Sequence, residues 1–376
     1  MKALMERGAI AALALAVVVL GAGCAHRPGL FGSSKSTPPP IGPPSAAVRM
    51  PQVTERVLPN GLTVLVSEYH ELPIMRFHLL VPGGGAYDPA GKEGVAELTA
   101  ALLDQGTTRR SAEELAREVE FLGGALGGDA GTDFSTVTGE FLSKDVDAGL
   151  DLFSDVVLHP SFPPDELRRA QGLALAGIIA GRESPGAIAE ICYARYAYGT
   201  HPYGHLSQGT EASLKRLQRA DVQAFYARHY VPERAVLVVI GDARSDDLFA
   251  KIERAFGGWR RGTGTLGRPP EAARITGRHI LLVDKPDATQ THIRIGTSAI
   301  ARTDPAYVSA NVMSTILGGG FGSRLIDELR VKRSLTYGAS SGFAARQVPG
   351  DFRVGTFTKV ETTGEALQVA LDVLQK

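Results

Sequence analysis

Two histidines, His201 and His205, have the spacing found in metal-binding helices. Residues four apart lie on the same face of a helix, where two imidazoles could bind Zn²⁺ together. Pro202 and Gly204 lie between them, however, and both residue types interrupt a helix. We therefore interpret this segment as a turn and expect no metal site in it.

Glu97 and Asp104 form a second candidate site, because paired carboxylates can act as a general acid and a general base. They lie seven residues apart on one face of the helix predicted within residues 94–107. The sequence gives no reason for a raised pKa in either group, so the pair alone does not predict catalysis.

Four glycines, Gly318, Gly319, Gly320 and Gly322, form a third candidate as a phosphate-binding loop. The Gly-Lys-Ser/Thr sequence that completes such a loop does not follow them. A turn between two helices explains these glycines better.

The stretch GVAELTAALLDQGT, residues 94–107, has the frame of a zinc-protease helix but not its ligands. In the H-x-x-E-H arrangement, two histidines on one helix face bind Zn²⁺, and the glutamate between them activates a water molecule. The corresponding positions here are Glu97, Ala100 and Ala101. Two of these three side chains are methyl groups, which cannot bind a metal.

This stretch resembles the pitrilysin/insulinase family of metallopeptidases, the inverzincins, in which it reads G-L-A-H-x-x-E-H-x-x-x-x-G-T. The frame residues that agree with the family are Gly94, Ala96, Gly106 and Thr107. The family takes its third zinc ligand from a glutamate on a later helix, where this chain has Gly177. The resemblance implies that all three ligands and the catalytic base are lost, so we expect no zinc here. Glu97 and Asp104 are then interpreted as a polar rim around the lost zinc site.

The resemblance extends from about Glu55 to the end of the chain and also covers Arg330 and Tyr337. The family places an arginine and a tyrosine seven residues apart in this region. The implied role of the pair is to hold the substrate backbone and to stabilise charge on the scissile carbonyl opposite the zinc. An alternative interpretation is a helix-end arginine bound to backbone carbonyls, together with a half-buried tyrosine.

Composition favours a folded protein of two ordinary domains. The chain has 376 residues, of which 44% are hydrophobic and 21% charged. Lys plus Arg and Asp plus Glu number 40 each, so no net field would recruit nucleic acid. We expect no nucleic-acid partner.

The N-terminus resembles a bacterial lipoprotein signal. Lys2 and Arg7 precede an apolar run, residues 9–20, that is too short to span a bilayer. We interpret residues 1–23 as the signal peptide, Cys24 as the lipidated residue, and the Pro/Ser/Gly-rich residues 24–52 as a tether. The alternative is an ordinary signal sequence with an incidental cysteine. The lipid anchor would place the protein in the cell envelope, facing the periplasm.

The second cysteine, Cys192, would have no partner for a disulfide, because Cys24 is consumed by the anchor. We interpret Cys192 as a small core residue.

The element pattern predicts an α+β fold. A hairpin is predicted around Asn60-Gly61, and Ser111 to Glu114 form a capping box. We expect further strands at 75–81, 125–132, 134–142, 235–242, 279–286 and 291–300, and helices at 111–122, 146–158, 164–181, 246–256, 305–317 and 323–333.

An internal repeat divides the chain into two modules, at 53–265 and 273–376. Pairing Phe357 with Phe141 aligns FRVGTFTKVETTGEALQVALDVL with TVTGEFLSKDVDAGLDLFSDVVL, with one gap before the helix. The resemblance implies that the modules form half of a clamshell. The second copy has no counterpart of the helix at 164–181, and we interpret it as incomplete, with apolar surface exposed at its edge.

Three functions remain open. The first is a non-catalytic subunit that closes the peptide chamber opposite a zinc-bearing partner of the same family. The second is a lipid-anchored module that captures extended peptides or supports an envelope complex without proteolysis. The third is a self-sufficient enzyme with an unrecognised metal or nucleophile.

Overall fold

The computed structural model describes residues 51–375. The predicted signal peptide 1–23, Cys24 and nearly all of the tether 24–52 lie outside the described residues. Within the described residues, no helix is long and apolar enough to cross a membrane.

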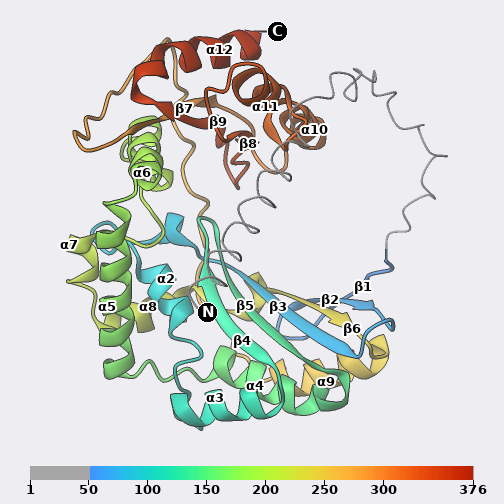
Figure 1. Ribbon diagram of the computed structural model, residues 1–376. Helices are drawn as coiled ribbons and strands as arrows, with labels where there is room; N and C mark the ends of the chain where they lie inside the picture. The colour runs from blue at the N-terminus through green and yellow to red at the C-terminus, as the bar shows by residue number, and fades with distance from the viewer. Residues whose placement is uncertain (1–50, 376) are drawn as a thin grey trace, which may run out of the picture. The chain divides into compact units, whose positions relative to one another are not determined.

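The first sheet contains six strands in the order β1-β2-β6-β3-β5-β4 (Figure 1). The strands are β1 (Thr54–Val57), β2 (Thr63–Glu68), β3 (Ile74–Pro82), β4 (Ala125–Ala130), β5 (Phe134–Leu142) and β6 (Val236–Gly241). Strands β2 and β6 are parallel and all other neighbours are antiparallel. The predicted hairpin around Asn60-Gly61 is confirmed, and Gly61 has the left-handed backbone (φ +93°) that favours glycine.

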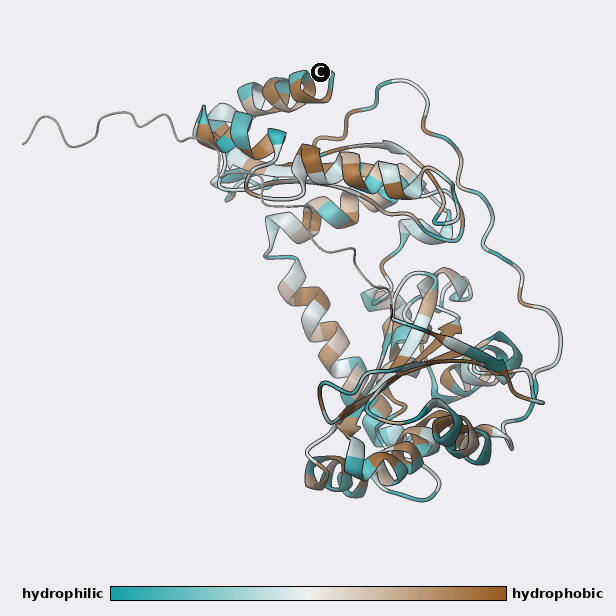
Figure 2. Ribbon diagram, turned by 90° about the vertical axis from the view of Figure 1, so that its right-hand side faces the viewer, coloured by the Kyte–Doolittle hydropathy of each residue, from teal (hydrophilic) through white to brown (hydrophobic). Residues whose placement is uncertain are grey.

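The main core lies between this sheet and its helices. The helices are α2 (Val95–Ala101), α3 (Ala112–Phe121), α4 (Val146–Leu158), α5 (Pro164–Gly181), α7 (Glu211–Leu214), α8 (Arg219–His229) and α9 (Ser245–Phe256). Alternate residues of β3, such as Phe77 and Leu79, are buried, because side chains alternate across a strand. The Phe77 ring stacks on Phe153 of α4 at 5.4 Å. The helices carry hydrophobic and hydrophilic residues in alternating bands, as expected of helices that bury one face (Figure 2).

The second sheet contains three antiparallel strands in the order β7-β9-β8. They are β7 (Gln290–Ser298), β8 (Ala339–Phe343) and β9 (Asp351–Lys359), accompanied by α10 (Tyr307–Gly318), α11 (Arg324–Ile326) and α12 (Thr363–Gln375). Ile293 of β7, Val354 of β9 and Val373 of α12 belong to its core. Helix α6 (Pro185–Tyr198) contacts β7, although its sequence precedes β6 of the first sheet.

The internal repeat is visible in the elements. Strand β5 has nine residues and is followed by a three-residue 3₁₀ turn (Ser143–Asp145) and the thirteen-residue α4. Strand β9 has nine residues and is followed by a three-residue 3₁₀ turn (Val360–Thr362) and the thirteen-residue α12. The two copies are therefore structural as well as sequence repeats. The module boundaries at 53–265 and 273–376 stay predictions.

Most predicted elements are present, and the Ser111 capping box is confirmed in both directions. The strand predicted at 279–286 is wrong, because these residues pair with no strand among residues 51–375. The helix predicted at 323–333 is the short α11, followed by a π-helical turn, Asp327–Val331. Cys192 is only partly buried, because α6 buries none of its residues completely.

Helix α2 packs closely on strand β4 at one glycine. A Cβ atom on Gly128 would lie 2.3 Å from the carbonyl oxygen of Ala100. No side chain can be accommodated at that distance without moving the helix or the strand. The neighbouring Gly127 is different, since a Cβ atom there would lie 3.9 Å from Asp104 Oδ2, an ordinary contact.

We expect Gly128→Ala to destabilise the protein, because α2 must move away from β4. Overpacking of this kind costs about 1–3 kcal/mol. The measurement is urea unfolding, with Gly127→Ala as the matched control on the same strand. Equal losses of stability in the two variants would contradict the close approach at Gly128.

Candidate functional site

The start of helix α2 is held by a carboxylate, Asp88, that the sequence analysis did not identify. Asp88 accepts hydrogen bonds from the backbone N–H groups of Gly94 (2.6 Å) and Ala96 (2.9 Å). Burial raises the pKa of Asp88 to about 7, although these two hydrogen bonds oppose the rise. An acidic residue shortly before a helix start is the signal that could have found it.

The frame residue Gly94 is required by the fold. Its φ is +98°, and a Cβ atom there would lie 2.8 Å from the carbonyl oxygen of Gln208. A larger residue would be strained by both its backbone angle and the contact. The agreement of Gly94 with the family frame is therefore explained by packing and backbone geometry, and it is no evidence of catalysis.

Glu97, at the first lost ligand position, binds the backbone of β4. Its Oε2 accepts the N–H of Ala130 at 3.1 Å. That N–H points away from β5, because the next residue, Gly131, donates its own N–H to Phe134 across the hairpin. Burial raises the pKa of Glu97, and the neighbouring Asp129 raises it further. Glu97 thus covers part of the open edge of the sheet.

The other lost positions offer no ligand. Ala100 is buried and Ala101 is partly buried on α2, while Gly177 lies on α5 facing open space. Asp104 does not share the helix face predicted for it, since α2 ends at Ala101. Burial raises the pKa of Asp104, and Gln105 donates a hydrogen bond to it at 2.6 Å. Within residues 51–375, no group of three or more His, Cys, Asp or Glu side chains could hold a metal ion.

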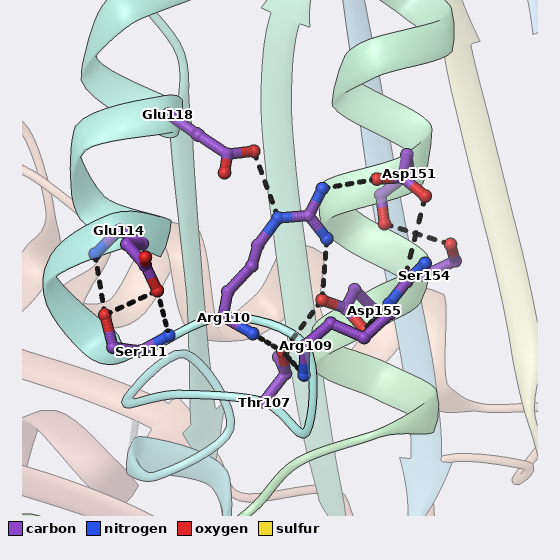
Figure 3. A network of polar contacts seen from close by, with 9 residues as sticks. All are labelled: Thr107, Arg109, Arg110, Ser111, Glu114, Glu118, Asp151, Ser154 and Asp155. Carbon is purple, nitrogen blue, oxygen red and sulfur yellow. Dashed lines mark hydrogen bonds and ion pairs between the residues drawn. The ribbon is translucent and has the colours of Figure 1, made fainter.

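The end of the frame belongs to an ionic network around the buried Asp155 (Figure 3). Asp155 of α4 has no exposed side-chain surface and accepts from Thr107 Oγ1 (2.8 Å), Arg109 Nε (2.7 Å) and Arg110 (2.8 Å). Arg110 also binds Asp151 at 2.7 Å. Burial alone would raise the pKa of Asp155, but these hydrogen bonds outweigh it and lower the pKa. Thr107 therefore ties the segment after α2 to α4.

The segment with His201 and His205 forms a turn, as the sequence predicts. Residues Pro202–Gly204 form a 3₁₀ turn, so His201 and His205 do not share a helix. His201 Nδ1 accepts from the N–H of Tyr203 at 3.1 Å, and its Nε2 lies 2.7 Å from the carbonyl oxygen of Pro270. Both ring nitrogens of His201 are thus engaged in structure. Of the candidate glycines, Gly318 ends α10, and Gly319, Gly320 and Gly322 lie in the predicted turn between α10 and α11.

Arg330 and Tyr337 lie on either side of a turn in the second module. Arg330 belongs to the π-helical turn, and its guanidinium lies over the Phe321 ring at 5.2 Å. Tyr337 precedes β8 and is 80% exposed, so it is not the half-buried tyrosine of the alternative interpretation. Its phenol is accessible to another molecule. Their role in substrate binding stays a prediction.

Comparison with known proteins assigns the chain to a family. Residues 63–203 match the family model described as insulinase (peptidase family M16), and residues 216–376 match the peptidase M16 inactive domain. A peptidase M16 inactive domain from Pseudomonas fluorescens, known from its crystal structure, is 32% identical with a TM-score of 0.81. The similarity covers 86% of this chain and 78% of that one. The chain belongs to the insulinase family.

Relatives of this insulinase-family chain have been described as peptidases and as non-peptidases. An uncharacterized zinc protease of Mycobacterium leprae is 28% identical over 87% of this chain and 74% of its own length. A protein of Helicobacter pylori described as a non-peptidase homolog is 25% identical over 73% of this chain and 63% of its own length. The periplasmic protease PqqL from Escherichia coli shares the fold, with a TM-score of 0.73 at 16% identity, over 88% of this chain and 37% of that one. These comparisons are consistent with a non-catalytic member of the family.

The chain keeps residues that position helix α2, and it has no histidine at positions 97 and 101, where the resemblance leads us to expect metal ligands. Gly94 permits the helix start, and Thr107 joins the Asp155 network. Glu97 Oε2 accepts the backbone N–H of Ala130. The contacts that position this helix are therefore made by residues of the frame, by Glu97 and by Asp155.

We expect Asp155→Asn to lower the free energy of unfolding by about 1.5–3 kcal/mol, because Arg109 and Arg110 lose their charged hydrogen bonds to the buried carboxylate. The control Asp151→Asn, whose carboxylate is half-exposed, is expected to cost about 1 kcal/mol or less. Urea unfolding at pH 7 measures both.

The pH dependence of this effect has a defined sign. Because the folded-state pKa of Asp155 is lowered, its stabilisation is complete above the unfolded pKa of about 3.9 and is lost as the pH falls through the folded value. The stability difference between wild type and Asp155→Asn should shrink as the pH falls below about 4. A difference that grows below that pH would contradict the ionic role.

Proposed function

We propose that this chain is the non-catalytic subunit of a two-chain insulinase-family zinc peptidase. The partner carries the intact H-x-x-E-H and the zinc, and this chain closes the peptide chamber. The proposal rests on helix α2. The helix packs closely on β4, Asp88 holds its start, and Thr107 fixes the segment after it. The residues at positions 97, 100, 101 and 177, in contrast, offer no zinc site. A protein that keeps this architecture without the metal is suited to assembly and substrate binding.

Arg330 and Tyr337 are the residues that we assign to substrate binding. A guanidinium and a phenol both donate hydrogen bonds, and neither can cleave a peptide alone. The exposure of Tyr337 supports this assignment, because a group that contacts a partner or substrate must be accessible in the isolated subunit. The Phe321 ring under Arg330 restricts the guanidinium and so reduces the entropy lost on binding.

The proposal predicts that the isolated protein contains no stoichiometric zinc and no peptidase activity, and that mixing it with a zinc-bearing relative gives activity that EDTA abolishes. Arg330→Ala should lower turnover of the mixture by about 10–100-fold, the range expected for one lost charge-assisted hydrogen bond in a transition state. Size-exclusion chromatography should show unchanged assembly.

Arg333→Ala is the matched control, because Arg333 is a nearby arginine already bound to Glu328. Its mixture should keep the parent turnover. An inert mixture, or an Arg330→Ala mixture as active as the parent, would refute the proposal. Tightly held zinc and EDTA-sensitive cleavage in the isolated chain would instead establish a self-sufficient enzyme.

A second candidate function is capture of extended peptides without proteolysis. Strand β4 is at the edge of its sheet, and its outward side is a template for strand addition. Glu97 already occupies the outward N–H of Ala130, which limits the length of edge available. This function predicts peptide binding that persists in EDTA and yields no product in any mixture.

We also propose that Cys24 is lipidated and anchors the protein to the cell envelope. The description of PqqL as periplasmic supports an envelope location for a relative of this fold. Cys24→Ser should move the protein from the membrane fraction to the soluble fraction on cell fractionation. Unchanged membrane association of Cys24→Ser would contradict the anchor.

A further inference from the structure

The loop between β8 and β9, residues 344–350, contacts the first module. Gln347 donates its backbone N–H to Oδ2 of Asp133 at 2.8 Å, although 214 positions separate the two residues in the sequence. Asp133 lies in the turn between β4 and β5 of the first sheet. The tip of a hairpin in the second sheet therefore meets the tip of a hairpin in the first.

Asp133 holds a second partner at the same point. The Tyr203 hydroxyl donates to Oδ1 of Asp133 at 2.9 Å and accepts the backbone N–H of Val348 at 3.4 Å. Asp133 is 7% exposed and Tyr203 is 2% exposed, so water has little access to replace these hydrogen bonds. We call Asp133, Tyr203 and the loop of residues 344–350 the module clasp.

Apolar and aromatic contacts surround the module clasp. Val348 is buried and packs with Ala86 and Tyr203 in a small cluster separate from the cores of the two sheets. The Arg346 guanidinium lies over the Tyr203 ring at 4.4 Å. The contact thus combines an apolar side chain, a cation over a ring and two backbone N–H groups, all supplied by one loop.

Helix α6 is fixed to the second sheet, although its sequence lies within the first module. The helix packs on β7 (Figure 1). Glu190 of α6 binds both Arg294 of β7 and Arg353 of β9. The hydroxyl of Tyr198, the last residue of α6, donates to Asp351 of β9 at 2.6 Å. We therefore treat α6 and the second sheet as one body.

The chain connects this body to the first sheet through residues without regular structure. These are residues 182–184, 199–201 and 257–289, none of which lies in a helix or strand. Segments of this kind absorb changes in backbone angles when two parts of a protein move. The position of the second module relative to the first therefore depends on noncovalent contacts, and the module clasp supplies buried ones.

The module clasp and Tyr337 lie at opposite ends of one hairpin. Tyr337 comes just before β8, and the loop of the clasp follows β8. Strand β8 pairs with β9 along its whole length, from Ala339↔Thr356 to Phe343↔Phe352. Paired strands move together, so holding the loop also restrains the end of the hairpin that carries Tyr337.

We propose that Asp133 is a positioning residue. Through the module clasp it fixes the β8–β9 hairpin, and with it Tyr337, relative to the first module. Without the clasp, α6 and the second sheet would turn together about the irregular connections. The clasp itself is independent of the proposed subunit function, and only its consequence for substrate binding by Tyr337 rests on that function.

The test measures one distance in the full chain, in which Cys24→Ser and Cys192→Ala remove the native thiols. Spin labels are attached at Tyr337→Cys in the second module and at Leu173→Cys on α5, two exposed positions. Pulsed electron paramagnetic resonance then gives the distribution of distances between the labels. We expect one narrow distribution in the parent and a distribution about twice as wide or wider in Asp133→Ala, because the hairpin has lost its anchor.

A second readout is hydrogen exchange of the unlabelled full chain, followed by mass spectrometry. Asp133→Ala removes the acceptor of the Gln347 N–H, so residues 344–350 should exchange about tenfold faster or more. Because Asp133→Ala could impair folding, Tyr203→Phe is measured as well. It keeps the buried ring, removes only the hydroxyl that joins Asp133 to Val348, and should change both readouts in the same direction.

Tyr226→Phe is the matched control, because it also removes a tyrosine hydroxyl. That hydroxyl donates to the carbonyl oxygen of Val157 at 2.6 Å within the first module and takes no part in the module clasp. The control should match the parent in both readouts.

Two results would overturn the inference. One is an unchanged distance distribution, or unchanged exchange of residues 344–350, in both Asp133→Ala and Tyr203→Phe. The other is an equal change in Tyr226→Phe, because the effect would then follow from lost stability and not from the clasp. Neither measurement uses the zinc-bearing partner, so an inert mixture would refute the subunit function and leave the clasp standing.

Discussion

The contact between Ala100 and Gly128 sets the position of the candidate site. A Cβ atom on Gly128 would lie 2.3 Å from the Ala100 carbonyl oxygen, so α2 leaves no room for a side chain at this point of β4. Glu97 then reaches the Ala130 N–H from the same helix, and Asp104 lies near Gly127 just beyond the helix end. The segment that leaves α2 is fixed in turn by Thr107 to the Asp155 network. These contacts together hold α2 on the sheet.

Within residues 94–107, the residues that maintain the fold mostly differ from those at the positions expected to bind a metal. Gly94 is required by its left-handed backbone, and Thr107 by its buried hydrogen bond to Asp155. Replacing either residue would destabilise the fold. Ala100 is buried and Ala101 is partly buried, so small apolar side chains fit these two positions of the core. Apart from Glu97, the residues that hold α2 in place are therefore other than those expected to bind a metal, and the fold by itself does not imply the chemistry.

The sequence correctly predicted those elements that are stabilised by interactions between residues close together in the chain. The Ser111 capping box involves residues three apart, and the hairpin at Asn60-Gly61 needs only a turn and two alternating strands. Residues 279–286 contain a continuous apolar run, ILLV, that also favours a strand, yet they form none, because a strand needs a partner that the segment itself cannot supply. The partners of Glu97 and Asp155 were also beyond reach, since Ala130 and Arg109 approach them only in the folded chain. The resemblance at residues 94–107 located the site but not these contacts.

Strand order in the first sheet has a consequence for biosynthesis. β6 lies between β2 and β3, although α5 and α6 precede it in the sequence. As the ribosome releases the chain, the β1–β2 hairpin can form early, but it cannot join the rest of the sheet until residues 236–241 have emerged. Contacts of such long sequence separation form slowly. The N-terminal hairpin therefore exposes its apolar face until β6 is in place, which makes incorporation of this hairpin a late step in folding.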